Sequence, residues 1–214
     1  MLIVALTGGI ATGKSIVAST LQSLGCYVHY ADQIAHQLME PGRPTWKKIV
    51  SRFGQEILNP DKTINRKKLG VLIFTDEKKR NFINQLIHPL VFEEKKEIID
   101  KLEKDGHHEI FVSEAALTIE AGFAEFFDKI IVVFCREEIQ IKRLMERDNI
   151  NREEALKKIA SQIPTEEKIK SADYAIDSSG AVQSTVEQTE KVFLSLKSDY
   201  KRKQEISKDK DKTT

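Results

Sequence analysis

Apolar residues along the chain form two kinds of run, and their alternation predicts an α/β fold. Leu2 to Leu6 and Lys129 to Phe134 are nearly continuous aliphatic runs, as expected for strands buried on both faces of a parallel sheet. Ser15 to Leu24 has apolar residues at helical spacing, and Cys26 to Tyr30 is a second short apolar run. A strand, a glycine-rich turn, a helix and a strand within about thirty residues have the length of a βαβ unit.

The middle of the chain is predicted to be helical. Ala31 to Met39 and most of Trp46 to Lys104 have helical spacing. Asn65 and Thr75 are predicted N-caps, and His88-Pro89 a corner. A long helical stretch between strands indicates an inserted subdomain at about 41–105.

The second half returns to strands. Residues 110–112 and 174–176 complete a predicted five-stranded sheet, with charged helices over 137–147 and 152–161 and an amphipathic closing helix over 182–196. Asn151 and Glu154 have capping-box spacing. We therefore predict one domain over 1–196, with its core at about 1–40, 106–136 and 172–196. Residues 197–214 hold seven Lys or Arg, four Asp or Glu and few apolar residues, and are predicted to be a disordered, solvated tail.

Composition narrows the class of protein. The 34 basic residues nearly balance 33 acidic ones over 214 residues, which argues against a nucleic-acid-binding surface as the main feature. No apolar run has membrane-spanning length, and the N-terminus lacks a signal-peptide pattern. Cys26 and Cys135 lack zinc-site spacing, so reduced thiols in a cytoplasmic protein are expected, with a single disulfide as the alternative.

The segment Gly8-Gly9-Ile10-Ala11-Thr12-Gly13-Lys14-Ser15 fits G-x-x-x-x-G-K-[ST] in full. Glycines let the backbone curl around phosphates, and the following helix directs its positive end at them. Lys14 is predicted to reach the β- and γ-phosphates, and the Ser15 hydroxyl to bind Mg²⁺. An apolar strand precedes the motif and a periodic helix follows it, so we expect binding of a nucleoside triphosphate with Mg²⁺.

Among phosphate-loop proteins, the remaining sequence favours a small-molecule kinase. The guanine-binding Asn-Lys-x-Asp element of GTPases is missing. Glu114 follows the third strand, where a Walker B acid is usual, but no Asp-x-x-Gly comes after it. A chain of this length also has little room for the helical lid domain of an AAA-type ATPase. Kinases need cations on the transferring phosphoryl group. Arg143 and Arg147 share one helix face within a basic segment, 137–171, that is predicted to be a lid.

An acceptor hydroxyl also needs a base or orienting group. Asp32 follows the second strand, and ligands bind at the carboxyl ends of parallel strands. Asp32 is therefore a candidate base, although an N-cap role for the next helix is compatible with the pattern. His36, on the same helix face, is predicted to be a surface or packing residue.

With these residues in place, the sequence resembles the dephospho-coenzyme A kinase family over residues 1 to about 196. The resemblance rests on the phosphate loop, Tyr30-Ala31-Asp32, Asn65-Arg66, His88-Pro89, Glu120-Ala121-Gly122, the series from Gln140 through Arg143 and Arg147 to Asp148, the series from Gln162 to Tyr174, and Ile176-Asp177-Ser178-Ser179-Gly180.

The resemblance implies a P-loop fold that transfers the ATP γ-phosphoryl group to the ribose 3′-hydroxyl of dephospho-CoA. It implies that Asp32, Lys14 and Arg143 are catalytic, and that the 41–105 subdomain binds the acceptor through residues that include Arg66 and His88, together with Asp32 and Glu120. The ATP-binding residues that it implies are Gly9, Ala11, Thr12, Gly13, Lys14, Ser15, Ile16, Arg143 and Asp177.

The sequence departs from the family pattern at Glu114 to Ile119, where a proline is lost, at Ile16 and at Ser178. These changes predict a looser loop near the acceptor and weaker adenine selectivity. Two alternatives stay open: a kinase for a nucleoside monophosphate or sugar acid, and a nucleotide-binding regulatory or RNA-associated protein that uses the basic tail. A monomer is expected, with a homo-oligomer as the alternative.

Overall fold

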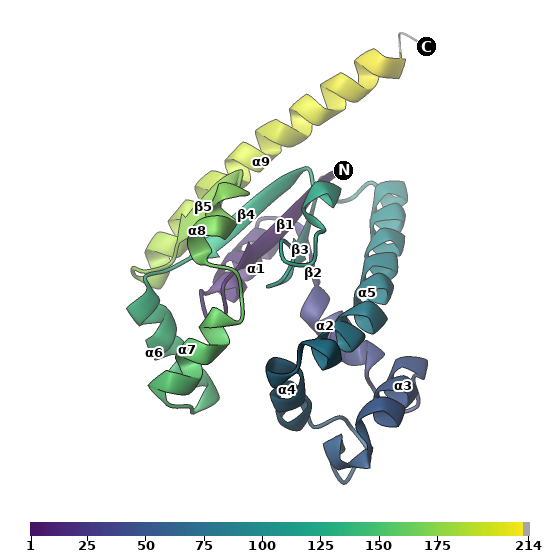
Figure 1. The fold of residues 1–214 in the computed structure, drawn as a ribbon. Helices are drawn as coiled ribbons and strands as arrows, with labels where there is room; N and C mark the ends of the chain where they lie inside the picture. Colours follow the sequence, from purple (N-terminus) through teal and green to yellow (C-terminus); the bar gives the residue numbers. More distant parts are fainter. Residues whose placement is uncertain (212–214) are drawn as a thin grey trace. The chain divides into compact units, whose positions relative to one another are not determined.

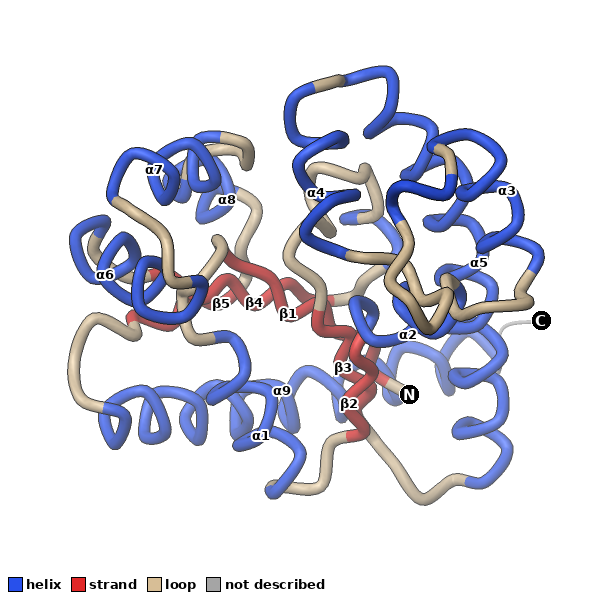
Figure 2. Tube along the Cα trace, turned by 90° about the horizontal axis from the view of Figure 1, so that it is seen from below, coloured by secondary structure: helices blue, strands red, loops and turns tan. Residues whose placement is uncertain are grey.

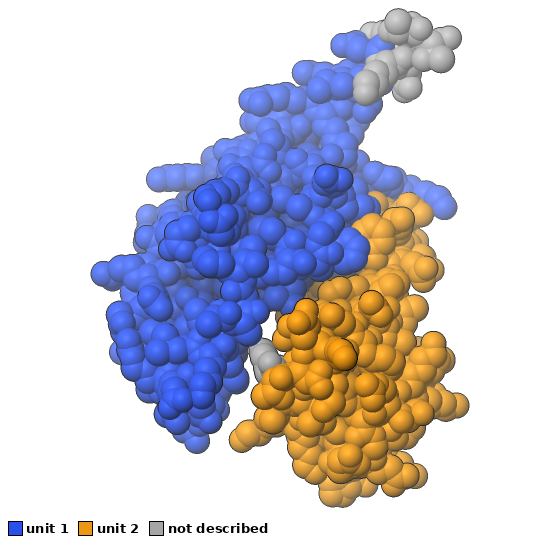
Figure 3. All heavy atoms as spheres, in the orientation of Figure 1, with its two compact units in different colours: residues 1–29, 102–214 blue, residues 30–101 orange. Residues whose placement is uncertain are grey.

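The computed structural model describes residues 1–211, apart from the side chains of Phe74, Lys210 and Asp211. The chain divides into two compact units (Figure 3): unit 1 comprises residues 1–29 and 102–214, and unit 2 comprises residues 30–101. The helical unit begins at Tyr30 and not near residue 41. Ala35, Leu38 and Met39 pack into the same apolar cluster as Ile49, so the helix that carries Asp32 belongs to unit 2.

Unit 1 is built on a five-stranded parallel sheet of order β2-β3-β1-β4-β5 (Figure 1). The strands are β1 (Leu2–Gly8), β2 (Tyr27–Tyr30), β3 (Ile110–Glu114), β4 (Lys129–Phe134) and β5 (Tyr174–Asp177). The aliphatic runs in β1 and β4 are almost fully buried, which confirms the prediction of central strands. β1 lies between β3 and β4. From β1 the chain passes to β2 on one side of the sheet, and after β3 it crosses to β4 on the other side of β1.

Helices of unit 1 cover both faces of this sheet (Figure 2). α1 (Lys14–Ser23) and α9 (Val182–Asp211) run along one face, and α6 (Glu137–Asp148), α7 (Arg152–Ala160) and α8 (Thr165–Lys170) lie on the other. A 3-10 turn, η2 (Ala124–Phe126), precedes β4. The predicted capping box at the start of α7 is present, with Asn151 and Glu154 each accepting from the other's backbone N–H.

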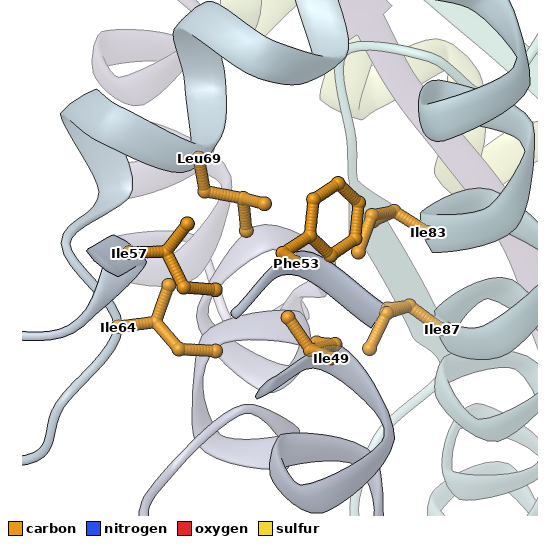
Figure 4. Close-up of a cluster of buried hydrophobic side chains, with 7 residues drawn as sticks. All are labelled: Ile49, Phe53, Ile57, Ile64, Leu69, Ile83 and Ile87. Carbon is orange, nitrogen blue, oxygen red and sulfur yellow. The ribbon is translucent and has the colours of Figure 1, made fainter. Parts of the chain in front are cut away.

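Unit 2 contains α2 (Ala31–Leu38), α3 (Pro44–Phe53), the 3-10 turn η1 (Gln55–Ile57), α4 (Arg66–Thr75) and most of α5 (Glu77–Asp105). Its core is a cluster of large aliphatic side chains around one phenylalanine (Figure 4), formed by Ile49, Phe53, Ile57, Ile64, Leu69, Ile83 and Ile87. Asn65 caps α4 as predicted, because its side chain accepts from Lys68 N.

Two local predictions in unit 2 were wrong. His88-Pro89 is not a corner, because α5 continues through Pro89; burial of Ile83 and Ile87 on the same helix outweighs the backbone bond that proline removes. Thr75 is not an N-cap but the last residue of α4. Its hydroxyl donates to Val71 O, while Asp76 Oδ1 accepts from Lys79 N.

The prediction that 197–214 are disordered was also wrong as far as Asp211, because α9 continues to that residue; residues 212–214 lie outside the described part. Three side chains of this segment bind the rest of unit 1. Asp199 accepts from Tyr174 Oη over 2.5 Å, Lys203 Nζ lies 2.6 Å from Asp128 Oδ2, and Lys197 pairs with Glu109. Charged residues with good helix propensity therefore extend the helix once these contacts anchor it.

Both cysteines are free thiols within unit 1. Cys26 is 3% exposed and Cys135 is 7% exposed. Burial raises the pKa of the Cys26 thiol to about 12, with Lys197 opposing the shift. Of the helices in the described part of the chain, none has the length and apolar character that a membrane crossing requires.

Candidate active site

The phosphate-binding loop follows β1 at the carboxyl end of the sheet. Gly13 has a φ of 88° and a left-handed conformation that precedes the first residue of α1, so the missing Cβ lets the loop turn directly into the helix. Gly8 is equally constrained, because a Cβ there would lie 2.2 Å from Val133 O on the neighbouring strand. The loop therefore runs close against β4, with the N-terminus of α1 facing the phosphate site.

Lys14 and Ser15 occupy the first turn of α1. Lys14 Nζ donates to the carbonyl oxygens of Gly8 and Gly9 over 3.1 and 3.0 Å, so its ammonium group lies along the loop. Ser15 is exposed. The described residues contain no cluster of three acidic, His or Cys side chains suited to a metal ion. A hydroxyl ligand together with phosphate oxygens fits the mode in which Mg²⁺ binds beside nucleotides.

Arg143 and Ser178 close the other side of the loop. Arg143, on α6, donates from Nη2 to Ser178 O over 2.8 Å and from Nη1 to Ser178 Oγ over 3.1 Å. Ser178 Oγ donates to Thr12 O over 2.6 Å. A guanidinium in this fork arrangement is well oriented, and Nη1 would lie 3.7 Å from a Cβ placed on Gly13. The arginine chosen from the sequence therefore borders the loop.

Two other predicted residues have local partners. Asp177 ends β5 and shapes the turn after it, because its Oδ1 accepts from Ser179 N over 2.8 Å. Arg147 contacts Asp148, with Nε and Oδ1 2.8 Å apart. Cys135 lies near this arrangement; burial raises the pKa of its thiol, while the charge of Arg143 lowers it.

The loop after β3 is held in place despite its departure from the family pattern. Ala115 N donates to Leu6 O over 3.0 Å. The Ala116 carbonyl accepts from Thr7 Oγ1 and from Lys168 Nζ over 3.2 and 2.9 Å. Lys168 also pairs with Glu120 Oε1 at 2.7 Å, and its side chain is 1% exposed. Glu120 thus anchors this loop to α8, and these contacts oppose the loosening predicted from the missing proline.

Unit 2 holds a cavity of about 830 Å³ that combines apolar and polar walls. Met39, Leu69 and Ile73 contribute apolar surface, and Arg66 and His36 line the same space. Burial lowers the pKa of His36, and the nearby charge of Arg66 lowers it further, while Asp32 opposes both. Burial and Arg66 therefore both favour the neutral form of the His36 imidazole. The sequence predicts only a packing or surface role for His36.

Asp32 and His88, both chosen from the sequence, lie in unit 2. Asp32 is in the first turn of α2, whose N-cap is Tyr30, so the alternative N-cap role is not observed. Its side chain is exposed. His88 is in the interior of α5, and burial lowers its pKa.

The parallel sheet with its phosphate-binding loop after the central strand defines the P-loop kinase fold. Shikimate kinase from Acinetobacter baumannii has this fold, with a TM-score of 0.51 at 16% identity over 93% of this chain and 94% of that one. More specifically, the sequence model of the family described as dephospho-CoA kinase matches residues 2–184. The chain belongs to the dephospho-CoA kinase family.

Individual relatives agree with this assignment. Dephospho-CoA kinase from Carboxydothermus hydrogenoformans is 44% identical over 87% of this chain and 90% of its own. The enzyme from Listeria monocytogenes is 42% identical over 86% and 92%. The solved dephospho-CoA kinase from Campylobacter jejuni is 30% identical, with a TM-score of 0.65 over 91% of this chain and 96% of that one.

Proposed function

We propose that this protein transfers the γ-phosphoryl group of MgATP to the ribose 3′-hydroxyl of dephospho-CoA, giving CoA and ADP. The observation that carries the proposal is the complete phosphate-binding loop bordered by the oriented guanidinium of Arg143, in a chain of this family. Phosphoryl transfer depends mainly on positioning and on charge stabilisation, and this arrangement supplies both.

On the nucleotide side, backbone N–H groups of residues 11–16 and the N-terminus of α1 bind the phosphates. Lys14 moves from the loop carbonyls to the β- and γ-phosphate oxygens. Ser15 binds the Mg²⁺ ion, which neutralises charge on these phosphates when it is bound. Arg143 stabilises the transferring group, and Asp177 shapes the turn beside the adenine.

On the acceptor side, Asp32 accepts or orients the proton of the attacking hydroxyl. Arg66 offers a guanidinium to the acceptor's pyrophosphate, and the mixed walls of the unit 2 cavity suit the rest of the molecule. His88 shapes the acceptor-binding unit, and Glu120 acts through its contact with Lys168. We further propose a cytoplasmic location, with which the free thiols Cys26 and Cys135 are consistent, and a monomeric state.

The reaction is tested by ADP release from MgATP with dephospho-CoA, set beside nucleoside monophosphates and sugar acids. Strong stimulation by dephospho-CoA alone supports the proposal. If another acceptor stimulates ADP release instead, that acceptor is the substrate. If nucleotide binds but no acceptor stimulates ADP release, a regulatory protein is favoured. Salt-sensitive RNA binding that requires residues 197–214 would favour the RNA-associated alternative.

The role of Asp32 is tested by Asp32→Asn. Because a positioned base contributes about 10²- to 10⁴-fold, we expect kcat to fall by about two to three orders of magnitude. Asp32 is exposed, so the unfolding midpoint in urea should hardly change. Asp100→Asn, an equivalent change at an exposed position of α5, is the matched control. Near-normal kcat in Asp32→Asn contradicts the assignment.

A further inference from the structure

Two glutamine side chains hold the same residue in the phosphate-binding loop. Gln140, in the first turn of α6, donates from Nε2 to Ile10 O over 2.8 Å. Gln162, between α7 and α8, accepts at Oε1 from Ile10 N over 2.8 Å. Together they satisfy both backbone polar groups of Ile10. The donor and acceptor roles are fixed, because a carbonyl can only accept and an N–H can only donate.

The loop is shaped to receive Gln140. This side chain is 4% exposed, and a Cβ on Gly9 would lie 2.7 Å from its Nε2 atom. Gly9 is not among the residues with positive φ. Its lack of a side chain therefore makes room for the glutamine amide and does not serve an unusual backbone conformation.

The neighbouring side chains add an apolar contact to these two bonds. Ile10 and Ala11 pack against Ile141, Leu144 and Ala155, which join α6 to α7. Ala11 has a φ of 58°, a conformation that is costly for a residue with a Cβ. Such strain persists where the surroundings hold the backbone in place, and the bonds to Ile10 act one residue away.

We propose that Gln140 and Gln162 are positioning residues for nucleotide binding, a pair that we call the Ile10 clamp. By fixing the loop at Ile10, the clamp sets the positions of the N–H groups that follow, from Gly13 to Ser15. Through Gln140 it also links the loop directly to α6, the helix that carries Arg143. The inference rests on the proposed function, since it assigns the clamp to the MgATP site of that reaction.

The same substitution at the two positions separates hydrogen bonding from charge. In Q162E a carboxylate still accepts from Ile10 N, whereas in Q140E a carboxylate cannot donate to Ile10 O and faces it with negative charge. Both variants add one negative charge beside the same residue. We expect Q140E to raise the Kd of MgATP on the order of tenfold, and Q162E to bind several times more tightly than Q140E.

Calorimetric titration with MgATP, without any acceptor, measures these constants, and urea unfolding reports stability. Equal Kd values for the two variants would show a charge effect alone and overturn the proposal, as would an unchanged Kd in Q140E. If Q140E does not fold, Q140M and G9A break the same bond without charge and must raise the Kd. Failure of dephospho-CoA turnover in the unaltered protein would contradict the proposed reaction, while this titration would still test the clamp.

Discussion

Among residues 8–15, Ala11 is the non-glycine residue with positive φ, and this conformation sets a limit on its side chain. A Cβ in the left-handed region costs about 1–2 kcal/mol, and branching at Cβ increases the clash. The small side chain still contacts the cluster around Leu144. Ala11 therefore balances backbone strain against packing.

We expect Ala11→Val to lower the free energy of unfolding by about 2 kcal/mol. Ala11→Gly should stay within about 1 kcal/mol of the unaltered protein, because relief of strain offsets lost contacts and the entropy of glycine. Urea unfolding of both variants measures these changes. Equal stability of the valine and glycine variants would mean that the conformation of residue 11 carries no strain.

The sequence predicts a site residue when the pattern that marks it lies within a short stretch of chain. Lys14 and Ser15 follow from one contiguous motif, and Arg143 from a basic helix combined with the family resemblance. The Ile10 clamp could not be derived in this way, since its partners lie 130 and 152 positions away along the chain. Gln140 and Gln162 belong to the residues that carry the family resemblance, but no spacing rule connects them to Ile10.

At the scale of elements, α9 shows how a charged sequence becomes helical through contacts with distant segments. We expect deletion of residues 197–214 to lower the free energy of unfolding by about 2 kcal/mol, because it removes the two ion pairs that join this segment to the rest of unit 1 and the hydrogen bond from Tyr174 to Asp199. Deletion of residues 204–214 keeps all three contacts and should cost clearly less. Equal losses in the two truncated proteins, measured in urea, would contradict this account.

The connection between α6 and α7 is predicted to be acid-sensitive. The pKa of Asp148 is lowered from 3.8 to about 2, chiefly by its hydrogen bond to Arg147, with Lys158 also contributing. A lowered carboxyl pKa gives stability that is present above pH 4 and is lost as the pH falls toward 2. Asp148→Asn should therefore unfold at a lower temperature at pH 6, with a smaller difference near pH 2.

Thermal unfolding of both proteins across pH 2–6 measures this effect. Asp100→Asn, an equivalent charge change at an exposed position of α5, serves as the control. A difference between Asp148→Asn and the unaltered protein that is independent of pH would assign the contribution of Asp148 to packing and not to its charge.

For the whole molecule, the sequence predicted the parallel sheet and a helical insertion, because buried strands and long helices differ strongly in periodicity. It placed the boundary near residue 41, since Pro41 and Gly42 look like a break. Burial of α2 side chains against α3 and α5 decides the boundary instead. Tertiary contacts of this kind have no signature within a short window of sequence.

The division into units predicts separate footprints for the two substrates. We expect MgATP to slow amide hydrogen exchange at residues 8–16 and 177–180 of unit 1. Dephospho-CoA should slow exchange mainly at residues 33–41 and 59–73, which line or adjoin the cavity of unit 2. Mass spectrometry of peptides from each unit measures both effects. If dephospho-CoA slowed exchange in unit 1 alone, the cavity of unit 2 would not be the acceptor-binding site.

Because both native thiols are buried, we expect the unaltered protein to react very slowly with thiol-reactive dyes. At neutral pH the Cys26 thiol is overwhelmingly protonated, given its pKa of about 12, and Cys135 is shielded by burial. A dye pair can therefore be attached at new cysteines replacing exposed Lys48 in unit 2 and Glu146 in unit 1, without first removing a native cysteine. Energy transfer between the dyes would then follow the distance between the two units during each catalytic cycle.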